Sequence, residues 1–149
     1  MKKRWLSAVL ALSVMLTLLP VTVLAATDHP FTDVPQSHWA NESVAYVYEN
    51  GLMSGVDGST FDPNGITTRG MIVTVLYRLA GEPNSSSTTR FADVAAGSWY
   101  APAVAWAASH DIVNGTSPTT FSPNAPITRE QMAVILYRYA DYRGYDRSP

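Results

Sequence analysis

The stretch FTDVPQSHWA at residues 31–40 recurs sixty residues later as FADVAAGSWY at residues 91–100. The same shift pairs FDPNGITTRG at residues 61–70 with FSPNAPITRE at residues 121–130. The two units that contain these stretches share 17 identities over 51 aligned positions without a gap. A fixed period kept over that length indicates an internal repeat, in which neighbouring units bury their apolar surfaces against each other.

Each unit predicts a first helix, at residues 37–50 and again at residues 98–110. Residues at helical spacing are expected to share one face of these helices: Trp39, Tyr46 and Val47, then Trp99, Trp106 and Ala107. A long loop follows each helix, and its glycine and proline residues are typical of turns. The phenylalanines expected in the core are Phe31, Phe61, Phe91 and Phe121.

A second helix is predicted to begin at Thr68 and at Thr128. Thr128 and Gln131 fit a capping box, in which the threonine hydroxyl accepts a hydrogen bond from the third helical amide and the glutamine reaches back. The apolar residues that follow at helical spacing are Met132, Ile135, Leu136 and Tyr139, matched by Ile72, Val75, Leu76 and Leu79. The sequence therefore predicts an all-α fold of tandem helix-loop-helix units, which must pack together because a unit of about 50 residues buries little surface alone.

The chain begins with the features of an export signal. Three basic residues at 2–4 precede an apolar run at residues 5–19, which Pro20 ends, and small residues follow up to Ala26. The run is shorter than the roughly 20 residues that span a bilayer, so a cleaved signal peptide is expected rather than a membrane anchor. We therefore expect an exported protein with no membrane association once the signal is removed.

Removing the signal changes the charge of the chain. The remainder carries seven arginines, no lysine and twelve acidic residues, a net charge of −5 against −2 for the whole chain. Such a balance gives no reason to expect nucleic acid as a partner. The absence of cysteine excludes disulfides, thiolate metal sites and thiol nucleophiles.

These observations divide the chain into five segments. They are a signal peptide at 1–26, a first repeat at 27–83, a polar linker at 84–90, a second repeat at 91–141 and a tail at 142–149. The tail reads either as a connector to a further repeat or as a truncated end.

The ordered set F-x-D-V, W, G, F-x-P-N and then T-R at a helix start, present twice behind a signal peptide, resembles the S-layer homology domain. The resemblance covers both units. It implies a secreted protein of the cell wall or S-layer that binds secondary cell-wall polysaccharide, often carrying a pyruvate ketal. It also implies a pseudo-trimeric helical bundle of three repeats with ligand grooves between adjacent repeats, so a two-repeat chain would either lack a third repeat or form a homo-oligomer.

The family signature T-R-A-E at the start of the second helix corresponds here to Thr128-Arg129-Glu130-Gln131 and Thr68-Arg69-Gly70-Met71. The resemblance implies that Arg69 and Arg129 contact ligand, with Thr68, Thr128 and Glu130 beside them. A helix N-terminus suits an anion, and a guanidinium can hold a carboxylate by two hydrogen bonds. The first unit lacks the acid, and Gly70 weakens its helix start.

Other repeated residues have two interpretations each. Trp39 and Trp99 are either core residues or part of a groove wall on which a sugar rests. Asp33 and Asp93 either cap the turn before the first helix or contact ligand through their carboxylates.

Gly55 and Gly115 are expected to need positive φ or close backbone approach, and they contribute to the groove surface. Arg78 and Arg138 are expected in ion pairs or on a solvated face rather than at ligand.

Other functions have less support in the sequence. An enzyme would need paired acids or a nucleophile with a base, and no such motif occurs apart from the repeated aspartates, so we expect no catalysis and no cofactor. A calcium loop around Asp57 has no acidic counterpart in the second unit, so no metal site is expected. A protein–protein scaffold that self-assembles in a surface layer remains open, as does a remnant of a larger surface enzyme.

Overall fold

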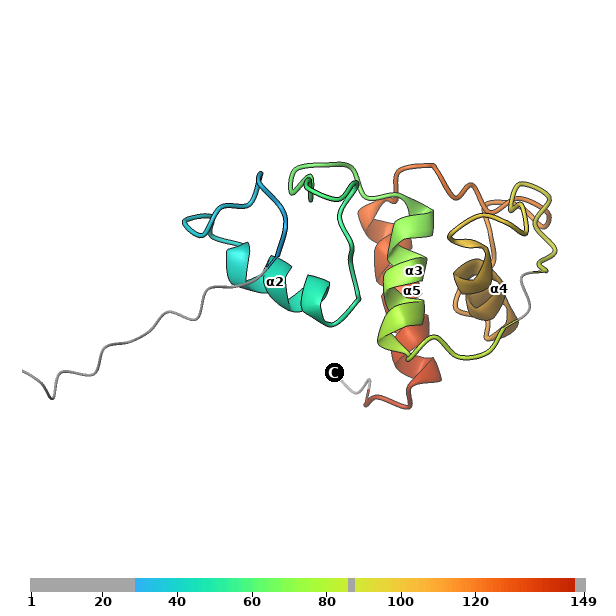
Figure 1. The fold of residues 1–149 in the computed structure, drawn as a ribbon. Coiled ribbons are helices and arrows are strands. Elements are labelled where there is room, and N and C mark those ends of the chain that lie inside the picture. The colour runs from blue at the N-terminus through green and yellow to red at the C-terminus, as the bar shows by residue number, and fades with distance from the viewer. Residues whose placement is uncertain (1–28, 86–87, 147–149) are drawn as a thin grey trace, which may run out of the picture.

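The computed structural model describes residues 29–85 and 88–146, and within these ranges it is all-α (Figure 1). Its helices are α2 (Asn41–Glu49), α3 (Arg69–Leu79), α4 (Ala101–Ser109) and α5 (Arg129–Tyr142). The predicted helix-loop-helix order of each unit is confirmed, while the predicted signal peptide at 1–26 lies outside the described residues. None of the helices in the described part is both long and apolar enough to cross a membrane.

The first helix of each unit begins later than predicted. Residues 37–40 and 98–100 form turns instead, closed by bonds such as Asn41 N–H to His38 O at 3.0 Å and Ala101 N–H to Ser98 O at 3.0 Å. Trp39 and Trp99 therefore precede their helices, and the prediction that they share a helical face with Tyr46 or Trp106 is wrong.

The second helices begin where the sequence predicts. The amide of Gln131 donates to Thr128 Oγ1 at 3.2 Å, and the amide of Thr128 donates to Gln131 Oε1 at 3.4 Å. In the first unit the amide of Met71 donates to Thr68 Oγ1 at 3.3 Å. These caps satisfy amides that the first helical turn leaves without partners, and so they fix both helix starts.

The two units are joined by packing α3 of the first unit against α4 of the second (Figure 1). Backbone bonds tie the start of α3 to the second loop: Gly70 N–H to Pro123 O at 2.8 Å, Arg69 N–H to Ala125 O at 3.0 Å, and Ile127 N–H to Thr67 O at 3.1 Å. A Cβ at position 70 would lie 3.1 Å from Pro123 O and 3.5 Å from Tyr100 Cδ1. Gly70 therefore permits the close approach of the two units.

The apolar core has two unequal parts. The larger cluster joins α3, α4, α5 and the second loop around the fully buried Trp106 and Phe121. The smaller cluster lies in the first unit and consists of Phe31, Val34 and Val44, with Phe61 partly buried beside them. The predicted phenylalanine core is confirmed, with Phe61 buried less completely than the others.

The predicted apolar stripes are confirmed only in part. Ile135, Tyr139 and Leu76 are buried, whereas Leu136 and Leu79 are exposed. The predicted burial of Leu136 and Leu79 is wrong. Whether such a residue is buried depends on which helix of another unit covers it, and helical spacing alone does not determine this.

Candidate functional site

Two pockets lie at equivalent places in the two units. The first-unit pocket has a volume of about 520 Å³ and the second-unit pocket about 360 Å³. Seven lining positions repeat at the sixty-residue shift: Met53/Val113, Ser54/Asn114, Gly55/Gly115, Met71/Gln131, Thr74/Val134, Val75/Ile135 and Arg78/Arg138. Both pockets thus lie between the second helix of a unit and the glycine turn after its first helix.

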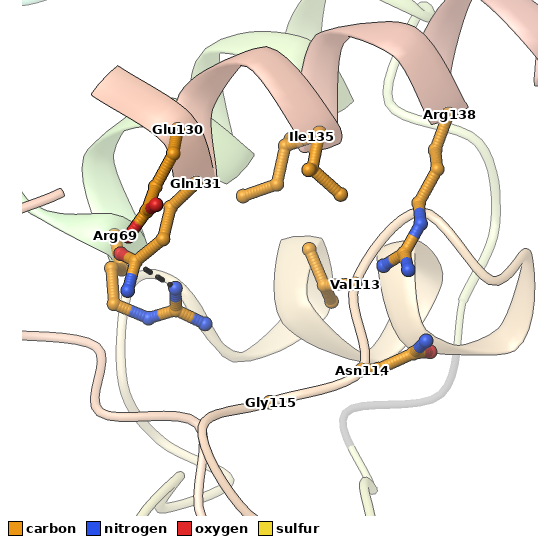
Figure 2. A pocket seen from close by; sticks show the side chains of 9 residues that line it. Arg69, Val113, Asn114, Gly115, Glu130, Gln131, Ile135 and Arg138 are labelled. Carbon is orange, nitrogen blue, oxygen red and sulfur yellow. Dashed lines mark hydrogen bonds between the residues drawn. The ribbon is translucent and has the colours of Figure 1, made fainter. Parts of the chain in front are cut away.

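Arg69 reaches into the second-unit pocket from the preceding unit (Figure 2). Its Nε donates to Phe121 O at 2.8 Å, its Nη1 donates to Gln131 Oε1 at 3.2 Å, and its Cζ lies 4.8 Å from the centre of the Phe121 ring. The side chain is only 5% exposed, and this burial lowers its pKa, although arginine stays charged at any physiological pH. The bonds fix the guanidinium in place and use two of its five N–H donors.

Arg138 projects from α5 into the same pocket, toward Asn114 (Figure 2). Within the described residues it has no carboxylate within ion-pair distance. Arg78, its counterpart in the first unit, donates to Leu52 O at 3.1 Å and lies 3.9 Å from the Glu82 carboxylate.

Of the two expectations, an ion pair or a solvated face, Arg78 meets the first, while Arg138 has no ion pair among the described residues and is partly exposed. Sequence reasoning missed that both arginines line pockets. The sequence does hold a signal that places Arg138 at the pocket. Arg138 follows Gln131 by seven residues, or two helical turns, so both lie on one face.

Trp99 of the second unit lines the first-unit pocket. It is 59% exposed and makes an edge contact with Tyr100, with ring centres 5.1 Å apart. Trp39 is 91% exposed and lines neither of the two pockets. The core interpretation is wrong for both tryptophans, because the turns that precede α2 and α4 direct them to solvent.

Asp33 and Asp93 hold the loops of their own units. Asp33 accepts the amides of Phe61 and Asp62 at 2.9 and 2.8 Å. Asp93 accepts the amides of Phe121 and Ser122 at 2.8 and 2.7 Å. The first of these bonds, from Phe61, is the main reason that the pKa of Asp33 is lowered. The interpretation that these aspartates cap the turn before the first helix is wrong, because their carboxylates hold the later loop instead, and neither residue lines either of these two pockets.

Gly55 and Gly115 form part of the pocket walls and satisfy both expectations made for them. Their φ angles are +75° and +79°, in the left-handed region that favours glycine. A Cβ at Gly115 would lie 2.5 Å from Thr120 O and 2.6 Å from Phe91 Cε1. Only glycine can bring the backbone this close, so the wall presents bare peptide to the pocket.

The residues at the starts of the second helices differ in whether they line a pocket. Glu130 lines the second-unit pocket, while Arg129 is exposed and lines neither of the two. Thr68 and Thr128 use their hydroxyls as helix caps. Of the two arginines implied by the resemblance, Arg69 therefore lines one of these two pockets and Arg129 lines neither.

The model of the S-layer homology domain matches residues 30–70 and 90–133, which is more than half of the chain. The chain belongs to the S-layer homology domain family.

Similar proteins include an S-layer protein of Bacillus thuringiensis subsp. finitimus, 33% identical over 117 residues, which are 78% of this chain and 14% of that protein. An endoglucanase of Bacillus sp. (strain KSM-635) is 30% identical over 146 residues, which are 94% of this chain and 15% of the enzyme. A cellulosome-anchoring protein of Acetivibrio thermocellus is 26% identical over 84% of this chain and 28% of that protein. The chain thus spans a small part of the length of each of these relatives.

The S-layer homology domains of this chain make it a cell-surface anchoring module. The family and its S-layer relatives indicate a secreted protein associated with the cell surface.

Proposed function

We propose that this chain anchors to the cell surface by binding secondary cell-wall polysaccharide in the two equivalent pockets, without catalysing a reaction. The observation that carries the proposal is the meeting of Arg69 from one unit and Arg138 from the next in one pocket beside the bare backbone of Gly115. Two guanidinium groups against the single carboxylate of Glu130 leave an excess of positive charge in this pocket, which suits an anionic ligand.

The chemistry of the lining fits an acidic sugar. A guanidinium forms two parallel hydrogen bonds to a carboxylate, such as that of a pyruvate ketal, and Arg138 is free of a competing acid among the described residues. Asn114 and Gln131 offer amide groups for hydroxyls, while Val113 and Ile135 offer apolar surface. A volume of about 360 Å³ lies within the usual range for small-ligand pockets.

In this proposal Arg69 has two roles. It fixes the second loop, and it presents its remaining N–H donors to the ligand. Trp99 supplies an exposed aromatic face to the first-unit pocket, where a sugar ring can stack. Thr68 and Thr128 support the pockets as helix caps, and Asp33 and Asp93 support them by holding the loops.

Two other functions remain as alternatives. The match to an endoglucanase over 15% of its length is compatible with a chain that once anchored a surface enzyme. A self-assembling scaffold is favoured by the apolar side chains exposed on α2 and α5, and it is compatible with polysaccharide binding.

The test is sedimentation of the purified chain with bacterial cell walls, before and after chemical removal of the wall polysaccharide. We expect binding to intact walls only, and a loss of tenfold or more in affinity for Arg138→Gln, since one charge-assisted pair contributes about 1.5–3 kcal/mol. Arg143→Gln is the matched control, because Arg143 lies outside both pockets and its substitution should leave affinity unchanged. Equal binding to stripped walls, or an unaffected Arg138→Gln, would overturn the proposal.

Pyruvylation is tested separately. Walls from a strain that lacks the pyruvate ketal should bind the wild-type chain as weakly as intact walls bind Arg138→Gln. Undiminished binding to those walls would remove the carboxylate from the proposal.

A further inference from the structure

In the first unit, the end of α3 places an acid beside the pocket arginine. Gly81 takes a φ of +87° after the helix, and its amide donates to Arg78 O at 2.9 Å. A glycine turn of this kind closes a helix, and the residue that follows it here is Glu82, whose carboxylate lies 3.9 Å from Arg78 Nε. Arg78 also donates to Leu52 O at 3.1 Å, so its guanidinium already has two partners within the first unit.

In the second unit, the same place holds an aromatic residue instead of an acid. Tyr142 stands where the first unit has Glu82, and α5 continues through it because Asp141 replaces the glycine of the turn. The Tyr142 ring packs against His110, with ring centres 4.8 Å apart. Arg138 therefore reaches into its pocket without a carboxylate at ion-pair distance among the residues that the structure describes (Figure 2).

The charges at the two pockets differ in sign as a result. The second-unit pocket has two guanidinium groups against the carboxylate of Glu130. At the first-unit pocket, the described charged groups are the guanidinium of Arg78, the carboxylate of Asp62 in the lining, and that of Glu82 beside the arginine. One positive charge is in excess at the second pocket and one negative charge at the first, so an anion is attracted to one and repelled by the other.

The rest of the first-unit pocket suits an uncharged sugar. Trp99 presents an exposed ring to it, on which the apolar face of a sugar can stack. Its wall also includes the apolar side chains of Met53, Ile66, Met71 and Val75. A largely apolar wall with few polar groups is typical of pockets that bind small neutral ligands.

We propose that the two pockets take different sugars of the wall polysaccharide, an acidic sugar in the second-unit pocket and an uncharged one in the first. The residue four positions after the pocket arginine decides between them: Glu82 withholds Arg78 from an anion, whereas Tyr142 leaves Arg138 available to one. This inference rests on the proposed function, because it requires that both pockets bind wall polysaccharide.

The first experiment follows the two pockets separately by nuclear magnetic resonance. The purified chain, labelled with ¹⁵N, is titrated with short oligosaccharides released from bacterial cell walls, either untreated or with their carboxylates reduced to alcohols. The amides of Gly55 and Gly115 report on the first-unit and second-unit pockets. We expect reduction to weaken binding at Gly115 about tenfold or more, because the charge-assisted pair with Arg138 is lost, and to change binding at Gly55 by less than about twofold.

The outcomes separate this inference from the proposed function. Equal weakening at both amides, no weakening at Gly115, or a Gly55 amide that responds to neither form would overturn the inference and leave polysaccharide binding in place. Oligosaccharides that move neither amide would contradict the proposed function, and the inference with it.

The second experiment removes the acid from the first unit. Glu82→Gln keeps the size of an exposed side chain and frees Arg78 from its carboxylate. Binding of the untreated oligosaccharides at Gly55 should become about threefold tighter or more, a change in keeping with an exposed ion pair, while binding of the reduced form stays the same. A Glu82→Gln chain that binds both forms as the wild type does would overturn the role given to this acid.

The third experiment adds the acid to the second unit. Tyr142→Glu recreates the four-residue spacing of the first-unit ion pair on α5, and Tyr142→Gln is the matched control that loses the same ring without gaining a charge. Untreated oligosaccharides should bind at Gly115 about threefold more weakly or less well still in Tyr142→Glu than in Tyr142→Gln. Equal affinities of the two variants would show that Arg138 is not controlled from this position and would overturn the proposal.

Discussion

Helices α2 and α4 occupy the same place in two copies of one repeat, yet α4 is buried on nearly all sides and α2 is not. Trp106 on α4 is fully buried, where its rings contact Tyr77 of the preceding unit and Tyr139 of its own. Tyr46, at the equivalent position of α2, is mostly exposed. The difference shows that a first helix is completed by the unit before it, so the stability of a repeat depends on its neighbour as much as on its own sequence.

The largest expected effect comes from truncating the two equivalent side chains. Trp106→Ala should lower the free energy of unfolding by about 3–5 kcal/mol, because it leaves a large cavity in the core. Tyr46→Ala should change it by no more than about 0.5 kcal/mol in urea melts at concentrations where the chain is monomeric.

Trp106→Phe serves as the control for this comparison. Its ring keeps most of the packing, and it removes an indole N–H that is buried without a partner in the described structure, so its cost should be well below that of Trp106→Ala. Equal losses for Trp106→Ala and Tyr46→Ala would contradict the difference between the two helices.

A smaller effect is expected from exchanging the residues that follow the helix-start arginines. Gly70→Glu should cost about 2 kcal/mol or more, since the new side chain must enter the joint against Pro123 and Tyr100. Glu130→Gly, the reverse exchange at an exposed position, should cost no more than about 1 kcal/mol, the helix propensity of glycine. Thermal melts of both variants make the comparison, and a Glu130→Gly variant less stable than Gly70→Glu would contradict it.

The smallest effect concerns the loop of the first unit at low pH. The folded chain lowers the pKa of Asp33, so its carboxylate stabilises the loop above the unfolded value of about 3.9, and this contribution disappears as the pH falls through the lower folded value. Hydrogen exchange at the amides of Phe61 and Asp62 should therefore lose protection below about pH 4, relative to other amides. Asp33→Asn should abolish this dependence, and a pH profile identical to that of the wild type would contradict the assignment.

Much of the local structure could be predicted from sequence because short-range chemistry decides it. The threonine caps at Thr68 and Thr128 and the turns at Gly55 and Gly115 depend only on residues nearby in the chain or on backbone conformation. The repeat itself, visible as a shift of sixty residues, indicated that units pack together.

The remaining features depend on contacts between residues distant in the chain. Leu76 and Leu136 are identical in the repeat, yet one is buried and the other exposed, because only α3 has a following unit in the described chain to cover. For the same reason the sequence left Trp99 between core and groove wall and did not place Arg138 at a pocket. Their surroundings are set by which loop and which unit lie opposite, and no periodicity within one helix carries that information.

The bond from Arg69 to the carbonyl of Phe121 joins residues 52 positions apart, and it bears on the order in which the chain folds. A polypeptide that emerges N-terminus first exposes the apolar side of α3 before its binding surface on the second unit exists. Non-local contacts of this kind slow folding, because the entropy cost of closing a long loop comes before the contact can stabilise the chain. Helix α3 of the first repeat thus leaves the ribosome before the second-unit surface that covers it has been made.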